Sequence, residues 1–354
     1  MGIETSCDET SASVVKNGKI LSNVIYSQLV HQKFGGVVPE IASRQHLKTI
    51  VPVAQEALNE AGISLRKIEG VAITYGPGLI GCLLIGLSWS KAVAYSLKIP
   101  FVGINHIEAH IFANLLEHPK LEPPFVCLVV SGGHSILVYV KDKGDYKIMG
   151  QTRDDAAGEA FDKVAKLLQI GYPGGPLIDQ MAKKGDKNFV KFPRAYLEKD
   201  SLDFSFSGLK TAVAIYLSKQ SKSKIGKHKK DIAASFQEAV VDVLIDKSVR
   251  ALNLAKTDKL VLAGGVARNS CLREKLEIKA KDLKFNLHYP SPELCTDNAA
   301  MVAICGDFYL SQGIKSDLSL SAIPYAKISS LFHYLEPVSR MKPNPLLSPL
   351  SGGH

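Results

Sequence analysis

Helical and strand-like patterns of hydrophobic residues alternate along the first third of the chain. Apolar residues recur with helical spacing over residues 51–61 and 79–96, and apolar runs over residues 70–74 and 101–104 predict strands. The stretch over residues 79–96 has apolar side chains on nearly every face, which is typical of a buried helix. Strands that alternate with helices favour an α/β architecture.

Two segments share one order of elements: a strand, a turn of small polar residues, a strand, a tight turn and a strand. The first begins at Ile3, and its tight turn is Asn17-Gly18, a dipeptide that favours a hairpin. The second begins at Val126, and its first turn consists of Ser131, Gly132, Gly133, His134 and Ser135. Small residues let an anion approach backbone N–H groups and hydroxyls. Each segment alone is an ordinary hairpin, but the repeat favours two facing turns that clamp a phosphate.

The pattern after the second segment is mainly helical. Helical spacing covers residues 158–169, 177–184 and 231–255, and a strand is expected over residues 259–263. This strand runs through Gly264-Gly265 toward Asn269. A strand, a glycine turn and a helix N-terminus together attract anions, although a Gly-Gly turn alone is more often a simple chain reversal.

Composition narrows the class of protein. The chain has 354 residues, which suggests two domains at about one domain per 150 residues. Hydrophobic residues make up 46% and charged residues 22%, as in an ordinary soluble globular protein. Disordered, collagen-like and disulfide-scaffold proteins are therefore excluded.

Positive charge is in excess. The chain has 43 Lys and Arg against 34 Asp and Glu, and the net charge of +9 favours polyanionic partners such as nucleic acid. Six lysines and His228 lie within residues 219–230. A solvated loop face is the ordinary interpretation of such a run, and a polyphosphate contact is the alternative.

Cysteines and apolar stretches bear on where the protein resides. Six cysteines are scattered without a CxxC pair, and no signal peptide precedes them, so we expect reduced thiols in a cytoplasmic protein. The longest apolar stretch, residues 79–89, contains Gly81 and Gly86 and is shorter than the roughly 20 residues of a membrane helix, so no span is expected. Residues 331–354 are proline-rich and are expected to be extended or disordered.

Two histidines are candidate metal ligands. Asn105 is a candidate helix N-cap, which places His106 and His110 one turn apart on one helix face. The pair either ligates one metal ion or is a chance surface pair. In HExxH zinc proteases the general base follows the first histidine directly, whereas Glu108 lies two residues on and points away from the shared face. Proteolysis is therefore disfavoured.

A third ligand has to come from elsewhere in the chain. Asp297, at the start of the last core helix, offers a carboxylate, although it is also a candidate helix cap. Two histidines and one carboxylate suit Fe(II) or Zn(II), and the pattern does not choose between them.

Two further aspartates, Asp162 and Asp179, flank the turn over residues 171–176. Either they accept hydrogen bonds from a substrate, or Asp162 pairs with Lys166 at i+4 and Asp179 lies on a solvated face. Taken alone, the residues favour the second interpretation.

Several motifs, in this order, resemble one family: GIETSCDET, HQKFGGVVPEIASRQH, TYGPGLIG, NHIEAH, VSGGHS, AGEAFDKVAKLL, GYPGGP, FSFSGLKTA, GGVARN and CTDNAAM. The chain is similar over roughly residues 1–325 to the TsaD family of tRNA N6-adenosine threonylcarbamoyltransferases, formerly labelled O-sialoglycoprotein endopeptidases. The resemblance implies an α/β fold of the actin-like or Hsp70-like (ASKHA) type, with two lobes that are each a βββαβα unit. The implied lobes are residues 1–114 plus 296–330 and residues 115–295, with the ligand between them.

The resemblance also implies site residues. The metal ligands would be His106, His110 and Asp297, for one divalent ion, with Fe(II) favoured over Zn(II). The substrate-binding residues would be Ser131, Gly132, Gly133, His134, Ser135, Asp162, Gly175, Asp179 and Asn269, which reverses the interpretation of the two aspartates. Asp8 and Glu9, on the first hairpin turn, are our candidates for positioning or for general-base catalysis.

The implied reaction moves the threonylcarbamoyl group from threonylcarbamoyl-adenylate to N6 of the adenosine 3′ of the anticodon, in tRNAs that read codons beginning with A. AMP is the other product. The implied partners are a TsaB-like paralogous subunit and a TsaE-like ATPase, while a TsaC-like synthase supplies the adenylate. An ATP-binding ATPase of the same fold and, less favoured, a metallopeptidase remain as alternatives.

Overall fold

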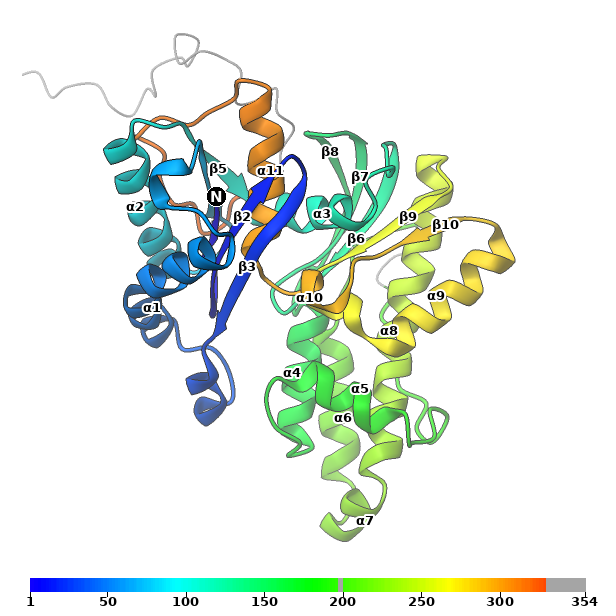
Figure 1. Cartoon of the computed structure of the whole chain (residues 1–354). Coiled ribbons are helices and arrows are strands. Elements are labelled where there is room, and N and C mark those ends of the chain that lie inside the picture. Colours follow the sequence, from blue (N-terminus) through cyan, green and yellow to red (C-terminus); the bar gives the residue numbers. More distant parts are fainter. Residues whose placement is uncertain (197–199, 329–354) are drawn as a thin grey trace, which may run out of the picture.

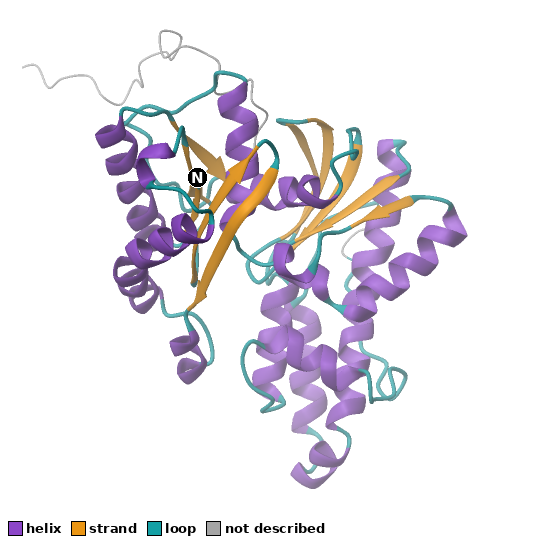
Figure 2. Ribbon diagram, viewed as in Figure 1, coloured by secondary structure: helices purple, strands orange, loops and turns teal. Residues whose placement is uncertain are grey.

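Two five-stranded mixed sheets form the framework of the chain. The computed structural model describes residues 1–196 and 200–328 (Figures 1 and 2). The strand orders are β3-β2-β1-β4-β5 and β10-β9-β6-β7-β8. The first sheet consists of β1 (Gly2–Glu4), β2 (Glu9–Lys16), β3 (Lys19–Ser27), β4 (Val71–Gly76) and β5 (Phe101–Asn105). The second consists of β6 (Phe125–Val130), β7 (Ser135–Asp142), β8 (Asp145–Gln151), β9 (Lys259–Ala263) and β10 (Asn286–His288).

The two sheets repeat one topology. In each, the first strand pairs antiparallel with the second and parallel with the fourth, as β1 does with β2 and β4 and as β6 does with β7 and β9. Both sheets therefore have the order third, second, first, fourth, fifth. The first unit begins as the expected βββαβα and continues with a fifth strand and a helix, whereas the described part of the second has five helices, α4 to α8, between its third and fourth strands. The expectation of a duplicated two-lobed α/β fold is confirmed.

Helices pack on both faces of each sheet. The first sheet packs against α1 (Pro39–Glu60), α2 (Ile80–Leu97) and α11 (Ala299–Ser311), and we call this unit the first lobe. The second sheet packs against α8 (Lys229–Ala255) and α9 (Ser270–Leu283). With α4 (Ala157–Leu167), α5 (Gly174–Ala182), α6 (Ser207–Ser218) and α7 (Lys222–Lys227), it is the second lobe. The short helix α10 (Pro292–Cys295) precedes α11.

Helix α3 (His106–Glu117) lies between the lobes, in contact with α11 and with strands of both sheets (Figure 1). The alternation of side chains along β6 explains how α3 and α8 pack on opposite faces of the second sheet. Val126 and Leu128 belong to the core that includes α8, whereas Cys127 and Val129 belong to the core that includes α3. A strand buried on both faces is thus covered by α8 on one side and by α3 on the other.

Several helices differ from the expected pattern, since α6 was not expected and α1 and α7 differ in extent or type. Helix α1 begins at Pro39, whereas the predicted helix began at residue 51. The hydrophobic pattern missed the first turns because their buried face holds small and polar side chains such as Ala42 and His46. Helix α7 lies in the lysine-rich segment, for which a solvated loop face was the ordinary interpretation: its lysines are exposed as expected, but the segment is helical and not a loop. Ser221 caps α7 by accepting a hydrogen bond from the Lys224 backbone N–H at 3.2 Å.

Helix α2 is long and apolar enough to cross a membrane by length and composition, since it continues past the apolar stretch to Leu97. The expectation of no span considered only residues 79–89. In the structure Cys82, Leu83 and Leu87 of α2 are buried, and the helix packs against β4 and α1. Only 39% of this helix is buried, so the expectation of a buried helix holds for the face that packs on the sheet and not for the whole helix.

Other expectations have mixed outcomes. All six cysteines are free, in agreement with reduced thiols. The proposed residue boundaries of the lobes stay a prediction, and residues 331–354 lie outside the part of the chain that the structure describes.

Asp154, which follows β8, caps α6 from a distance. Its carboxylate accepts hydrogen bonds from the backbone N–H groups of Phe206 and Ser207, at 2.8 and 3.2 Å, and from the hydroxyls of Ser205 and Ser207. Burial alone would raise the pKa of Asp154, but these hydrogen bonds hold it below its usual value. The carboxylate therefore joins the end of the second sheet to the start of α6.

Replacing Asp154 by alanine is expected to destabilise the fold by about 1–2 kcal/mol, the usual cost of losing a helix cap. Because the folded pKa is depressed, this stabilisation is present above the unfolded pKa of about 3.9 and is lost as the pH falls through the folded pKa. Urea unfolding at pH 7 and pH 3 measures both effects, with Asp282→Asn on the exposed face of α9 as a control. A difference from wild type that is the same at both pH values would contradict the assignment.

Candidate active site

The three predicted metal ligands meet between the lobes. Helix α3 carries His106 and His110 on one face, and Asp297 directly precedes the N-cap of α11. His110 Nε2 lies 3.1 Å and His106 Nε2 lies 3.5 Å from Asp297 Oδ1. Asn105 caps α3 by accepting from the backbone N–H groups of Ile107 and Glu108, as expected.

The alternative role of Asp297 as a helix cap is not realised. Asn298 is the N-cap of α11, and its side chain accepts from the Met301 backbone N–H at 3.1 Å. The Asp297 carboxylate is therefore available to the two histidines. Both histidine rings are buried, which excludes the alternative of a chance surface pair.

Two residues of the first lobe orient His106. Its Nδ1 lies 3.1 Å from Glu4 Oε2 and 3.2 Å from Ser6 Oγ. Glu4 in turn accepts from the Ser6 backbone N–H at 2.5 Å and from the Thr74 hydroxyl at 2.6 Å. With Nδ1 held by a carboxylate, Nε2 faces Asp297, which is the arrangement that metal-binding histidines usually have. The sequence pattern did not reveal Glu4, and its one signal is a carboxylate inside an otherwise apolar strand.

The electrostatics of this cluster favour a positive charge. Burial alone would lower the pKa of His106, but the Asp297 and Glu4 carboxylates raise it to about 9. Burial likewise opposes ionisation of Asp297, yet His106 and His110 hold its pKa well below its usual value. Two carboxylates around two imidazoles therefore stabilise a cation at their centre.

The donor set fits a divalent metal ion. The ligand atoms of His106, His110 and Asp297 all lie within 4.8 Å of one another. His110 Nδ1 is buried and has no hydrogen-bond partner among the described residues, so the hydrogen bonding of this ring is incomplete within the chain. Two imidazoles and one carboxylate suit Fe(II) or Zn(II).

Glu108 lies on the other side of α3. Its carboxylate accepts hydrogen bonds from the hydroxyl of Tyr146, at 2.7 Å, and from that of Tyr309. Burial raises the pKa of Glu108 to about 7. Because these tyrosines come from β8 and α11, Glu108 joins α3 to both lobes. It points away from the helix face that carries His106 and His110, as the spacing predicted.

The turn between β6 and β7 lies beside the metal ligands. The His134 ring centroid is 6.3 Å from that of His106, and burial together with the two neighbouring histidines lowers the pKa of His134 to about 4. The Ser131 backbone N–H donates to the His134 carbonyl oxygen, and the His134 backbone N–H donates to the Ser131 hydroxyl. Gly132 and Gly133 are exposed, with open space at their Cα atoms. Ser135 is buried, and its hydroxyl accepts from the Ala157 backbone N–H at 2.9 Å.

The other predicted substrate positions lie around α5 and the start of α9. Asp162 accepts from the Gly174 backbone N–H at 2.6 Å, and burial raises its pKa to about 6. Asp179 accepts from the backbone N–H and the hydroxyl of Ser270, so it supports the N-terminus of α9. Neither the Asp162–Lys166 pair nor a solvated Asp179 is found among the described residues.

Asn269 and Gly175 have different environments. Asn269 caps α9 by accepting from the Leu272 backbone N–H at 3.0 Å, and it donates to Gln237 Oε1 at 2.8 Å. Gly175 has no atom within 4 Å of the place where a Cβ would lie. Asn269 therefore fixes local structure, whereas Gly175 leaves room for a ligand.

Asp8 and Glu9 face the second lobe. Burial, followed by the neighbouring Asp8 carboxylate, raises the pKa of Glu9 well above its usual value. Asp8 also contributes, after burial, to the raised pKa of Asp162 and of Tyr172. The first hairpin turn and the α4–α5 region therefore share one electrostatic environment.

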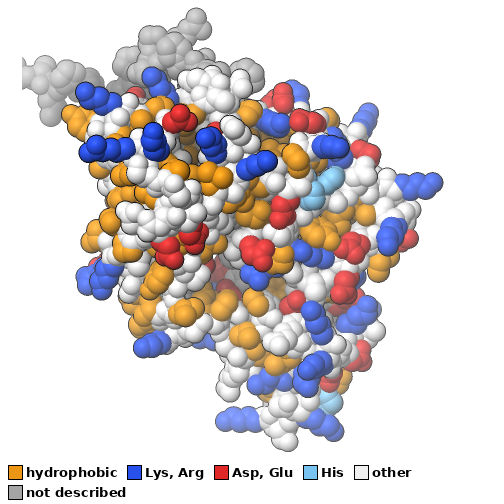
Figure 3. Space-filling model, in the orientation of Figure 1, with side chains coloured by type: hydrophobic (Ala, Val, Ile, Leu, Met, Phe, Trp, Pro, Cys, Tyr) orange, Lys and Arg blue, Asp and Glu red, His pale blue; other side chains and the backbone are white. Residues whose placement is uncertain are grey.

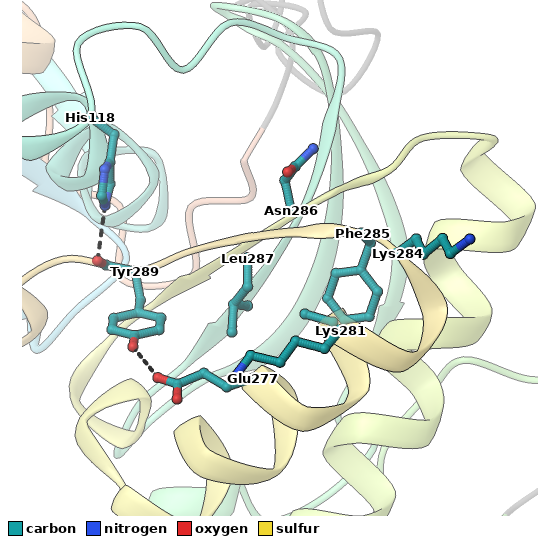
Figure 4. Close-up of a pocket in the computed structure, with 9 residues that line it drawn as sticks. His118, Glu277, Lys281, Lys284, Phe285, Asn286, Leu287 and Tyr289 are labelled. Carbon is teal, nitrogen blue, oxygen red and sulfur yellow. Dashed lines mark hydrogen bonds between the residues drawn. The ribbon is translucent and has the colours of Figure 1, made fainter.

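A pocket of about 780 Å³ lies apart from this site, between α9 and β10 (Figure 4). Its polar groups bond one another: Tyr289 donates to Glu277, and the His118 ring bonds to the Tyr289 carbonyl oxygen at 3.1 Å. None of the predicted site residues lines it.

Comparison with known proteins agrees with the geometry. The family model described as "TsaD: tRNA N6-adenosine threonylcarbamoyltransferase" matches residues 19–304. A protein of that name from Clostridium kluyveri is 53% identical over 331 residues, which cover 93% of this chain and 97% of the relative. One from Clostridioides difficile (strain 630) is 54% identical over 331 residues, covering 93% and 98%.

Two solved structures are similar in fold alone. HypF of T. kodakarensis has a TM-score of 0.61 at 14% identity, over 88% of this chain and 48% of that one. Component A of the Acidaminococcus fermentans (R)-2-hydroxyglutaryl-CoA dehydratase has a TM-score of 0.53 at 15% identity, over 88% and 98%. Both have the actin-like fold expected here. From its family model and its relatives, the chain belongs to the TsaD family of tRNA N6-adenosine threonylcarbamoyltransferases.

Proposed function

We propose that the chain moves the threonylcarbamoyl group from threonylcarbamoyl-adenylate to N6 of the adenosine 3′ of the anticodon, in tRNAs that read codons beginning with A. The observation that carries this proposal is the meeting of His106, His110 and Asp297 beside the open Gly132-Gly133 turn. A cationic centre beside a turn whose glycines let a ligand approach the backbone closely suits a substrate with a phosphate next to a carbonyl.

His106, His110 and Asp297 would hold one divalent metal ion, with Fe(II) favoured and Zn(II) as the alternative. When bound, the ion would act as a Lewis acid that stabilises negative charge on the adenylate. Glu4 and Ser6 keep the His106 ring in its orientation, and Glu108 keeps α3 fixed between the lobes.

The remaining residues bind and orient the two substrates. Gly132, Gly133 and Gly175 leave space for the adenylate, while Ser131, Ser135, Asp179 and Asn269 fix the backbone around that space. His134, beside His106, and Asp162, beside Gly174, are the remaining proposed substrate contacts.

In the reaction the N6 nitrogen attacks the carbamoyl carbon, and the bond from that carbon to the phosphate oxygen breaks. AMP leaves with the electron pair, and N6 loses a proton. Asp8 and Glu9, the two carboxylates of the first hairpin turn, are the proposed groups that position the adenosine or accept this proton.

The proposed partners are a TsaB-like subunit and a TsaE-like ATPase in the cytoplasm, with a TsaC-like synthase as the source of the adenylate. Leu47 and Val51 of α1 and Ile80 and Leu84 of α2 are exposed, and they offer an apolar surface to the TsaB-like subunit. Co-migration of the two chains in size-exclusion chromatography tests this pairing, and separate elution of stable chains would contradict it.

The test of the reaction is nucleoside mass spectrometry of unmodified tRNA incubated with the adenylate and the chain, with and without the partners. Threonylcarbamoyladenosine, formed together with AMP and only in tRNAs that read codons beginning with A, is the expected product. ATP hydrolysis without any modified nucleoside, even with the partners present, would instead support the ATPase alternative.

A further inference from the structure

Lysines from two separate segments gather at one end of the second lobe. They lie at the C-terminal end of α5 and after it, and around α7 between α6 and α8 (Figure 1). Figure 3 shows Lys and Arg side chains gathered at this tip of the molecule. The exposed members, which we call the lysine surface, are Lys183, Lys184, Lys187, Lys191, Lys219, Lys222, Lys224, Lys227 and Lys230.

The fold holds the two segments together. Gly185 packs so closely on the backbone of Lys230 that a Cβ at Gly185 would clash with it. The Asp186 backbone N–H donates to Asp231 Oδ1 at 2.9 Å, and the rings of Phe189 and His228 stack with centroids 4.6 Å apart. The lysines therefore form one surface in the folded chain, although the sequence separates them into two groups.

Lysines outnumber acids at this surface. Within residues 1–196 and 200–328, the only ion pair that involves a member of the lysine surface is between Lys187 and Glu238, at 3.4 Å. Asp186 and Asp231 lie beside the nine lysines, and Asp231 also pairs with His228 at 2.9 Å. A patch with a large excess of one sign attracts a polyanion over a distance of several ångströms.

The composition of the surface indicates which polyanion it fits. Lysine offers a mobile point charge, which suits the repeated phosphates of a nucleic acid backbone more than a single planar anion. Ile225 is the only aliphatic side chain larger than alanine in α7, and it is half-buried, so the helix lacks the apolar face with which helices lie in a membrane.

We infer that the lysine surface binds the phosphate backbone of the tRNA substrate and positions the tRNA for the site between the lobes. This inference rests on the proposed function for the identity of the RNA. The surface contains none of the site residues, so it contributes to affinity and not to chemistry.

The test replaces six of these lysines by glutamine: Lys183, Lys184, Lys222, Lys224, Lys227 and Lys230. A matched control replaces six exposed lysines elsewhere: Lys16, Lys19, Lys256, Lys279, Lys281 and Lys284. A third variant changes the first six to arginine, which keeps their charge. The dissociation constant of tRNA is measured by fluorescence anisotropy at several salt concentrations, with the full chain and its partners.

We expect the glutamine variant to bind tRNA about 10–100-fold more weakly at low salt, with a flatter salt dependence, because each lost phosphate contact lowers the slope by about 0.7–0.9. The arginine variant and the control should bind as wild type does. At saturating tRNA the glutamine variant should keep its kcat with a raised KM.

Equal tRNA affinity of the glutamine variant and the control would overturn the inference. So would loss of binding to phosphatidylserine vesicles with tRNA binding intact, since that result assigns the surface to a membrane. The test separates this inference from the proposed function. If the wild type transfers the threonylcarbamoyl group and the glutamine variant binds tRNA as tightly as the wild type, only the role of the lysine surface is refuted. If the glutamine variant binds tRNA more weakly but the wild type transfers nothing, only the proposed reaction is refuted.

Discussion

Replacement of His110 by alanine should lower threonylcarbamoyl transfer by at least about 100-fold and release the bound metal ion. Removing one of three ligands costs more than the roughly 10–100-fold typical of losing a residue that only orients a ligand. His110 is buried, and its Nε2 lies 3.1 Å from Asp297, so no other side chain of the described chain replaces it there. Nucleoside mass spectrometry measures the product, and elemental analysis of the purified protein measures the metal.

His118→Ala is the matched control for this variant. His118 follows the last residue of the same helix, but its ring bonds to the Tyr289 carbonyl oxygen and lies outside the site. Full metal content and full transfer in the His110 variant would refute the metal site. Circular dichroism verifies that both variants are folded.

Replacement of Glu4 by glutamine is expected to weaken metal binding by about 10–100-fold while leaving the three ligands in place. Burial alone would raise the pKa of Glu4, but His106 holds it below its usual value, so a carboxylate stands against the ring. The neutral amide keeps the shape but loses the charge that fixes the tautomer of His106. Competition with a chromophoric chelator measures the affinity without reference to activity.

Glu60→Gln, at the exposed end of α1, controls for the loss of one negative charge. An unchanged metal affinity in Glu4→Gln would show that the contact between Glu4 and His106 has no part in the site. A weakened affinity in both variants would point to overall charge instead.

Local signals predicted the hairpins well and the arrangement of strands less directly. Asn17 and Gly18 both have positive φ angles, of 51° and 73°, which is what their residue types favour in a two-residue turn. The pairing of β1 with β4 brings together residues far apart in sequence, and no local pattern encodes it. The arrangement of the strands was predicted only through the resemblance to a family.

The helices missed by periodicity lack an apolar stripe. Helix α7 has lysines at half of its positions, and only its cap, Ser221, marks its start. The first turns of α1 bury His46, which bonds to Thr10 at 2.8 Å and to the Cys7 carbonyl oxygen at 2.9 Å. Buried polar side chains such as His46 find their hydrogen-bond partners in the folded structure, so a pattern of hydrophobic residues does not reveal that they are buried.

In the candidate site, too, some features were predictable from the sequence and others depend on the fold. The spacing of His106 and His110 on a helix was readable from the sequence, and so was the direction of Glu108. The presence of Glu4 behind His106 depends on the strand β1 lying beside α3, which is a property of the fold. Asp162 and Asp179 were assigned through the family resemblance, because their backbone partners, Gly174 and Ser270, are set by how α5 meets its neighbours.

The contact between Gly2 and α11 has a consequence for how the protein is made. A side chain at Gly2 would clash with the backbone of Ala299 and Ala303, so the first strand and the last described helix need each other at close range. During translation β1 leaves the ribosome long before α11 exists, whereas β6 to β10 emerge as one continuous stretch. The second lobe can therefore assemble first, while one face of the first sheet stays exposed until α11 has been made.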